Sequence, residues 1–135
     1  MHSARRTIVA AAVAAAGMVF GMGEAQAAPK SGVWGGQLAV LTLNEQGGRL
    51  EFGCGYATLA TPVTPDRKGR FKAVGLYFPD PVGLVDADLP PVKVTARIEG
   101  AFTGDSVHIR FKPAGGAVEI LDLAAGKRGK LIRCL

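Results

Sequence analysis

Strict alternation of apolar and polar residues in two neighbouring segments limits what this chain can fold into. In segment 92–100 (VKVTARIEG) apolar residues alternate with charged or polar ones, and segment 106–112 (SVHIRFK) repeats the pattern. A period of two is typical of half-buried antiparallel strands, because successive side chains of a strand point to opposite faces. Gly104-Asp105 lies between the segments and suits a tight turn. The sequence therefore predicts a β-hairpin here.

The remainder of the chain favours strands as well, since each apolar run is bounded by Gly, Pro, Asp or Asn. The expected strands cover 33–43, 49–59, 70–78, 117–123 and 130–135, in addition to the two of the hairpin. Gly47-Gly48 is expected to form the turn between the first two, because glycine accepts positive φ angles. The segment 79–91 contains four prolines and is expected to be either a long crossing connection or a loop at one end of the barrel. The predicted fold is all-β, a small antiparallel barrel or sandwich of about seven strands.

The first 27 residues follow the pattern of a secretory signal peptide. Arg5 and Arg6 precede an uncharged, alanine-rich run, and Ala25-Gln26-Ala27 is a small-x-small cleavage pattern. A helix needs about 20 apolar residues to span a bilayer, and this run is shorter. We therefore expect cleavage after Ala27 and a periplasmic or secreted bacterial protein, exported by either the general or the twin-arginine route.

The chain that remains, 28–135, is the right size for a single β domain with one core. The formal net charge of the full sequence is +5, and it falls to about +4 for residues 28–135 when the charges of the signal segment are removed. Such a charge favours long-range attraction to anions. We expect an anionic envelope component or another protein as partner, no nucleic acid, no transmembrane segment in the mature chain and a monomeric state.

The two cysteines, Cys54 and Cys134, permit one intramolecular pairing. In an exported domain of this size a disulfide is the expected state. It would close a loop of about 81 residues, which on the chain-entropy model contributes roughly 4 to 5 kcal/mol. A redox site is the alternative, but it expects two cysteines close in sequence or a thiolate beside a basic group. The sequence favours a structural disulfide.

Catalytic and metal-binding motifs are scarce. His108 is the only histidine after the signal segment, and period-two alternation places it on the solvent face of its strand. Asp86 and Asp88, with Asp80 nearby, are interpreted as solvated loop carboxylates rather than a calcium site. No cofactor, metal site or enzymatic activity is expected, and a small periplasmic hydrolase is the rival hypothesis.

Two groups of residues are candidates for ligand contact. Trp34, the only tryptophan, is either a core aromatic that plugs one end of the barrel or a stacking surface beside Tyr56, Tyr77 or Phe78. The basic cluster Lys127, Arg128 and Lys130 is either a solvated hairpin tip or an anion-binding corner, where backbone amides of a glycine-flanked turn assist the cations.

The opening GVWGG, the segment LEFGCGYATL and the ending LIRCL resemble a group of small exported bacterial proteins of uncharacterised function. A Gly-x-Trp opening followed by up-and-down strands is also similar to barrels of the lipocalin and avidin type. The second resemblance implies a ligand pocket, and neither resemblance assigns binding residues.

The expected function is therefore non-catalytic binding or interaction with the cell envelope, with two rival surfaces. A small-ligand carrier would use an apolar barrel mouth near Trp34. An interaction module would use the connection 79–91 or a basic outer face, made by Lys93, Arg97, Arg110 and Lys112.

Overall fold

The computed structural model describes residues 28–80, 89–90, 92–127 and 131. The predicted signal peptide, the predicted strand 130–135 and Cys134 lie outside these residues. The described residues form eight strands: β1 (Gly32–Gly35), β2 (Ala39–Asn44), β3 (Gly47–Phe52), β4 (Gly55–Leu59), β5 (Arg70–Pro79), β6 (Val94–Thr103), β7 (Ser106–Pro113) and β8 (Glu119–Ala125). No helix in this part of the chain is long and apolar enough to cross a membrane.

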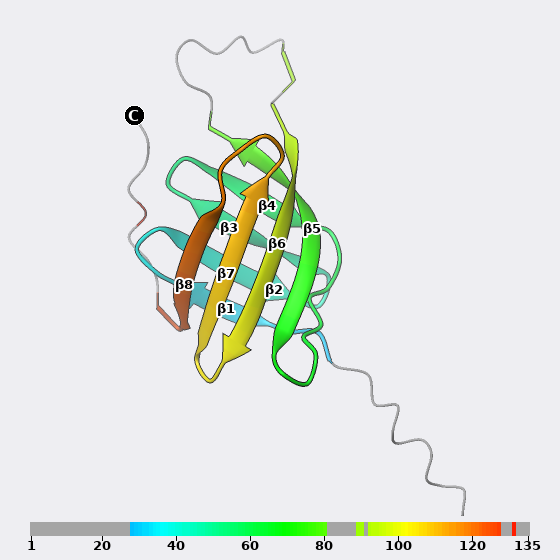
Figure 1. The fold of residues 1–135 in the computed structure, drawn as a ribbon, viewed down its shortest axis with the longest axis vertical. Helices are drawn as coiled ribbons and strands as arrows, with labels where there is room; N and C mark the ends of the chain where they lie inside the picture. The colour runs from blue at the N-terminus through cyan, green and yellow to red at the C-terminus, as the bar shows by residue number, and fades with distance from the viewer. Residues whose placement is uncertain (1–27, 81–88, 91, 128–130, 132–135) are drawn as a thin grey trace, which may run out of the picture.

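The strands form a closed antiparallel barrel in which each strand pairs with the next one along the chain. Figure 1 shows β5–β8 side by side at the front, with β1–β4 crossing behind them. The barrel closes through a short ladder between β1 and β8, which pairs Trp34 with Ala125 and Gly35 with Ala124. The prediction of an all-β antiparallel fold is confirmed, and the alternatives of barrel and sandwich are decided for the barrel.

The described residues form eight strands where about seven were predicted for the whole chain, because two expected strands are each divided by a turn while the expected strand 130–135 lies outside the described residues. Segment 33–43 is divided at Gly36, where a Cβ atom would lie 2.9 Å from the backbone oxygen of Asp122 on β8. Segment 49–59 is divided at Gly53-Cys54, which form a two-residue turn between β3 and β4. At Gly36 the missing side chain leaves room for the backbone of β8, and in both places the apolar residues on either side conceal the turn in the sequence.

The predicted hairpin between β6 and β7 is confirmed, with Gly104-Asp105 as its turn. The β2–β3 turn differs from the prediction, because Glu45-Gln46 form it rather than Gly47-Gly48. The Asn44 side-chain oxygen accepts hydrogen bonds from the backbone N–H groups of Gln46 and Gly47, at 2.8 and 2.9 Å. These local hydrogen bonds favour a turn two residues earlier in the chain than predicted.

Apolar side chains fill the interior of the barrel. The barrel end that holds the β2–β3 and β6–β7 turns is closed by Trp34, which is 4% exposed and packs on Phe102 with ring centroids 5.1 Å apart. Val63 from the loop 60–69 is also buried, and the Lys30 ammonium lies 5.0 Å from the centre of the Phe102 ring. We call the barrel end that Trp34 closes the Trp34 end. The opposite end, which holds the Gly53-Cys54 turn, is the Cys54 end.

Candidate functional site

The outer face of β5, β6 and β7 carries charged side chains in cross-strand rows. One row pairs Arg70 with Ala101 and then His108, and the next pairs Lys72 with Glu99 and then Arg110. A third row pairs Val74 with Arg97 and then Lys112. Directly opposite side chains on neighbouring strands lie close enough to interact. The antiparallel register therefore gathers, on one surface, cations that are up to about 40 residues apart in sequence.

Seven exposed cations define what we call the basic face. They are Arg67, Lys68, Arg70, Lys72, Arg97, Arg110 and Lys112. Three carboxylates lie among them, on Asp66, Glu99 and Asp122, so this surface has a net charge of +4 with His108 neutral. The other described residues carry four cations and five carboxylates, a net charge of −1. Among the described residues, the positive charge is therefore concentrated on the outer faces of β5–β7 and in the turn that leads into β5.

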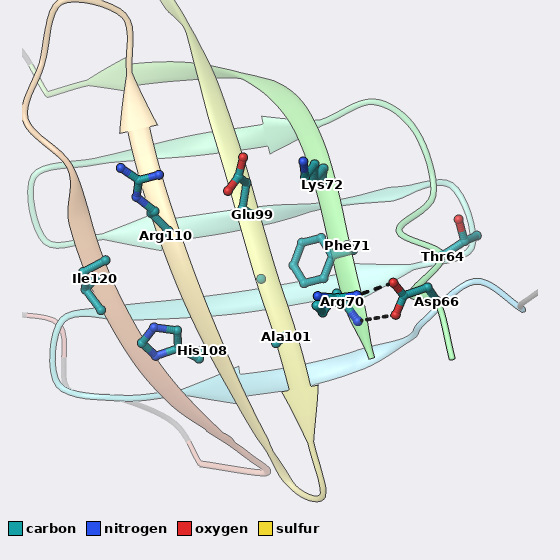
Figure 2. A pocket seen from close by; sticks show the side chains of 11 residues that line it. Thr64, Asp66, Arg70, Phe71, Lys72, Glu99, Ala101, His108, Arg110 and Ile120 are labelled. Carbon is teal, nitrogen blue, oxygen red and sulfur yellow. Dashed lines mark hydrogen bonds and ion pairs between the residues drawn. The ribbon is translucent and has the colours of Figure 1, made fainter. Parts of the chain in front are cut away.

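A depression of about 750 Å³ lies at the centre of this surface, over Ala101. Figure 2 shows Arg70 and Lys72 on one rim, His108 and Arg110 on the other, and Glu99 between them. The depression exists because Ala101 has a single methyl group where its neighbours carry long side chains. An anionic group placed there would be reached by cations from two strands.

Asp66 organises the turn that leads into β5. Its carboxylate accepts hydrogen bonds from the backbone N–H groups of Arg70 and Lys68, at 2.9 and 2.8 Å. The bond from Arg70 is the largest cause that holds the pKa of Asp66 below its ordinary value of 3.8. The Arg70 guanidinium also lies 3.7 Å from this carboxylate. Arg70 is thus positioned, while the other cations of the basic face form no ion pair within the described residues.

His108 lies on the exposed side of β7, in agreement with the alternation. Its Nδ1 atom is 2.6 Å from a carboxylate oxygen of Asp122 on β8. Within the described residues this is the only side-chain hydrogen bond of His108, so no Ser, Thr or Cys is held against it as a nucleophile would be.

A second depression, of about 500 Å³, lies at the Cys54 end. Its floor is an aromatic cluster in which the Tyr77 ring lies edge-on to Phe52 and Phe111, with centroid distances of 5.9 and 5.2 Å. Leu38 and Ile120 on its rim are 65% and 50% exposed. Burial, and then the nearby carboxylates of Glu119 and Asp80, raise the pKa of Tyr77.

The three aromatic candidates do not form one site. Trp34 lies in the core at one end of the barrel, and Tyr77 lines the depression at the other end. Tyr56 points outward from β4, where it stacks on Phe78 at 5.0 Å and is covered by the Arg49 guanidinium at 3.9 Å. The apolar mouth expected near Trp34 is therefore at the Cys54 end instead, because Trp34 and Phe102 fill their own end.

The remaining candidates are only partly described. Lys127 is exposed and follows the end of β8, whereas Arg128 and Lys130 lie outside the described residues. Cys54 lies in the β3–β4 turn, and the described residues include no free cysteine. Since Cys134 is not described, the Cys54–Cys134 pairing stays a prediction. In the described part of the chain no group of three or more His, Cys, Asp or Glu residues could hold a metal ion.

The cations that precede and begin β5 are not among the candidates that the sequence pattern indicated. The run DRKGRFK, 66–72, which leads into the expected strand 70–78, contains four cations and one carboxylate. Its charge density is the signal that could have identified it. The expected face of Lys93, Arg97, Arg110 and Lys112 was right for its last three members, whereas Lys93 precedes the first paired residue of β6.

Comparisons with family models, characterised proteins and solved structures gave no match.

Proposed function

We propose that this protein is an exported, non-catalytic binding protein that holds an anionic partner on its basic face. The observation that carries the proposal is the charge distribution, with a net +4 on the basic face and −1 on the other described residues. Concentrated charge of one sign attracts a partner of the opposite sign and accelerates encounter. The signal-peptide pattern supports the envelope as the place where this encounter occurs.

The exposure of three cations of the basic face, and their lack of ion pairs within the described residues, support a role in binding over a role in solubility alone. Lys72, Arg97 and Arg110 are exposed and form no ion pair within the described residues, so a partner need not displace an existing carboxylate from them. Lysine offers a mobile ammonium, and arginine offers a planar fork of donors that fits carboxylate, sulfate or phosphate oxygens. The depression over Ala101 adds a concave surface beside them.

Charge reversal tests the proposal directly. The double variant Arg97→Glu/Arg110→Glu should bind poly-L-glutamate and dextran sulfate at least about tenfold more weakly than the wild type at low salt, because both sites then repel the probe. The control Arg49→Glu/Lys127→Glu changes the net charge equally, at two cations that lie on β3 and after β8, outside the basic face. An equal or larger loss in the control would place the binding site elsewhere and contradict the proposal.

A disulfide between Cys54 and Cys134 is part of the same proposal. The location of Cys54 in a tight turn, with Gly53 and Gly55 on either side, leaves its side chain accessible to a second chain segment. A cross-link from this turn to the far end of the chain would stabilise a barrel that closes through only a short β1–β8 ladder.

A second candidate function is the binding of a small apolar ligand at the Cys54 end. The exposed Leu38 and Ile120 above an aromatic floor favour it. The neutral fluorophore N-phenyl-1-naphthylamine should then become fluorescent with the wild type and lose this signal with Leu38→Asp. Equal signals from the two proteins would exclude this site.

A further inference from the structure

One part of β5 has a strand neighbour on one side only. The ladder with β6 extends from Arg70 to Tyr77, whereas the ladder with β4 covers only Leu76 to Pro79. β4 ends at Leu59, and the chain then leaves the sheet as the loop 60–69. The stretch 71–75 of β5 therefore forms a strand edge inside an otherwise closed barrel.

The hydrogen bonds around this stretch show which backbone groups face the edge. The carbonyl of Gly69 accepts from the N–H of Phe102, on the β6 side, whereas the carbonyl of Arg70 accepts from the N–H of Asp66 in the loop. Because these directions alternate along a strand, Lys72 and Val74 direct their N–H and C=O groups away from β6. No backbone hydrogen bond joins Lys72 or Val74 to the described loop residues 60–69.

A surface depression and several cations lie beside these backbone groups. A depression of about 580 Å³ lies beside the edge, lined by Thr61, Lys72, Ala73, Val74, Arg97 and Glu99. Val74 is 64% exposed although it is a large apolar residue in the middle of a strand. The cations of the run 66–72 continue the basic face up to this edge. An open edge of this kind is a template for pairing with another chain.

We propose that the edge of β5 at Lys72 and Val74 binds an extended, acidic segment of a partner protein as an added strand. The proposal rests on the anion-binding function proposed above and specifies its partner as a polypeptide. Strand addition uses backbone hydrogen bonds for affinity and alternate side chains for selectivity. The stretch 71–75 accommodates about five residues, at roughly 3.3 Å per residue.

The side chains of the edge define the pattern of the partner segment. Residues on the outer side of the added strand would lie beside Lys72 and near Arg97, where acidic side chains are favoured. Residues on the inner side would lie beside Ala73, which is half-buried, and so would be small and apolar. The expected segment alternates acidic and small apolar residues.

Backbone-modified peptides separate strand addition from charge attraction. The probe is a capped heptapeptide of alternating Glu and Val, compared with two versions N-methylated on all Glu or on all Val residues, at unchanged charge. Only alternate N–H groups of a strand face its neighbour, so one methylated version should bind the full chain at least about tenfold more weakly, while the other retains more of the affinity. Equal affinities of all three peptides would overturn the proposal.

Amide hydrogen exchange locates the contact. The N–H groups of Lys72 and Val74 should exchange rapidly in the free protein and slowly with saturating unmethylated peptide. The variant Val74→Pro removes one N–H group that does not bond to β6, and should lose peptide affinity while it still binds dextran sulfate. Its matched control, Val74→Thr, keeps the N–H group and should bind both probes.

The probes distinguish failure of this inference from failure of the proposed function. Binding of dextran sulfate and of all three peptides alike, without protection of Lys72 and Val74, would refute strand addition and leave the anion-binding face intact. If neither dextran sulfate nor any peptide binds, both proposals are wrong. The exchange measurement uses the wild type, so it decides the question even if Val74→Pro fails to fold.

Discussion

Glu99 lies directly opposite Arg110 across the β6–β7 ladder, yet no ion pair joins the two side chains. Lys72 is the neighbour of Glu99 on the other side, and no ion pair joins this pair either. Glu99 is thus a carboxylate at the centre of the basic face. It lowers the local positive potential without holding either cation in place, and it opposes the approach of an anionic partner.

Removal of this charge should strengthen binding. Glu99→Gln should raise the affinity for poly-L-glutamate by about two- to fivefold at low salt, because one repulsive charge at the centre of the site disappears. Isothermal titration calorimetry measures the change. Glu45→Gln, in the exposed β2–β3 turn, removes the same charge away from the basic face and should have a smaller effect. A rise no larger than that of the control would show that Glu99 does not face the bound anion.

Two glycine substitutions test the barrel geometry. Gly47 has a φ of +154°, and an added Cβ would lie 2.0 Å from the backbone oxygen of Leu59, so Gly47→Ala forces the β3–β4 region apart. Gly104 has a φ of +59° with nothing within 4 Å of an added Cβ, so Gly104→Ala introduces only backbone strain of about 1 kcal/mol. In urea unfolding, Gly47→Ala should lower the free energy of unfolding at least about twice as much as Gly104→Ala does. Equal losses would contradict the described contact.

The Asp66 turn makes part of the stability depend on pH. Since its pKa is lowered in the folded chain, its contribution is present above the ordinary value of 3.8 and is lost as the pH falls through the lower folded value. Asp66→Asn retains an acceptor oxygen but does not titrate. The stability difference between wild type and Asp66→Asn should therefore favour the wild type at pH 7 and shrink as the pH falls below 3.8. A difference that stays constant would exclude the carboxylate as its source.

The intact mass of exported protein tests the signal peptide and the disulfide together. The mature chain should begin at Ala28 and weigh two hydrogens less than its reduced form. Reduction should lower the free energy of unfolding by roughly 4 to 5 kcal/mol, less any strain in the folded state. A Cys54→Ser variant should have the stability of the reduced wild type. Two thiols that react with an alkylating reagent before reduction would rule out the pairing.

The β6–β7 hairpin could be predicted from the sequence because its alternation extends over both strands and its turn contains glycine. The two divided strands could not be predicted so easily, because each half keeps an apolar pattern through the turn. The division at Gly36 depends on the close approach of β8, which is a contact between distant parts of the chain. Local pattern therefore identified the strands better than it identified where they end.

The candidate site depends even more on tertiary register. The alternation indicated that Arg97, Arg110 and Lys112 share an outer face, since these residues belong to one hairpin. It could not align Lys72 with Glu99, because that alignment is set by the β5–β6 ladder across the long connection 79–91. The open edge at Val74 arises from the difference in extent between two ladders, which no sequence period encodes.

The most direct test of the basic face is a residue-resolved titration. Backbone amide resonances of the full mature chain would be followed by nuclear magnetic resonance as poly-L-glutamate is added at low salt. We predict that the largest shifts occur in 66–74, around Arg97 and around Arg110, and that they weaken as salt is added. Shifts confined to the Cys54 end, or spread evenly over the barrel, would contradict this prediction.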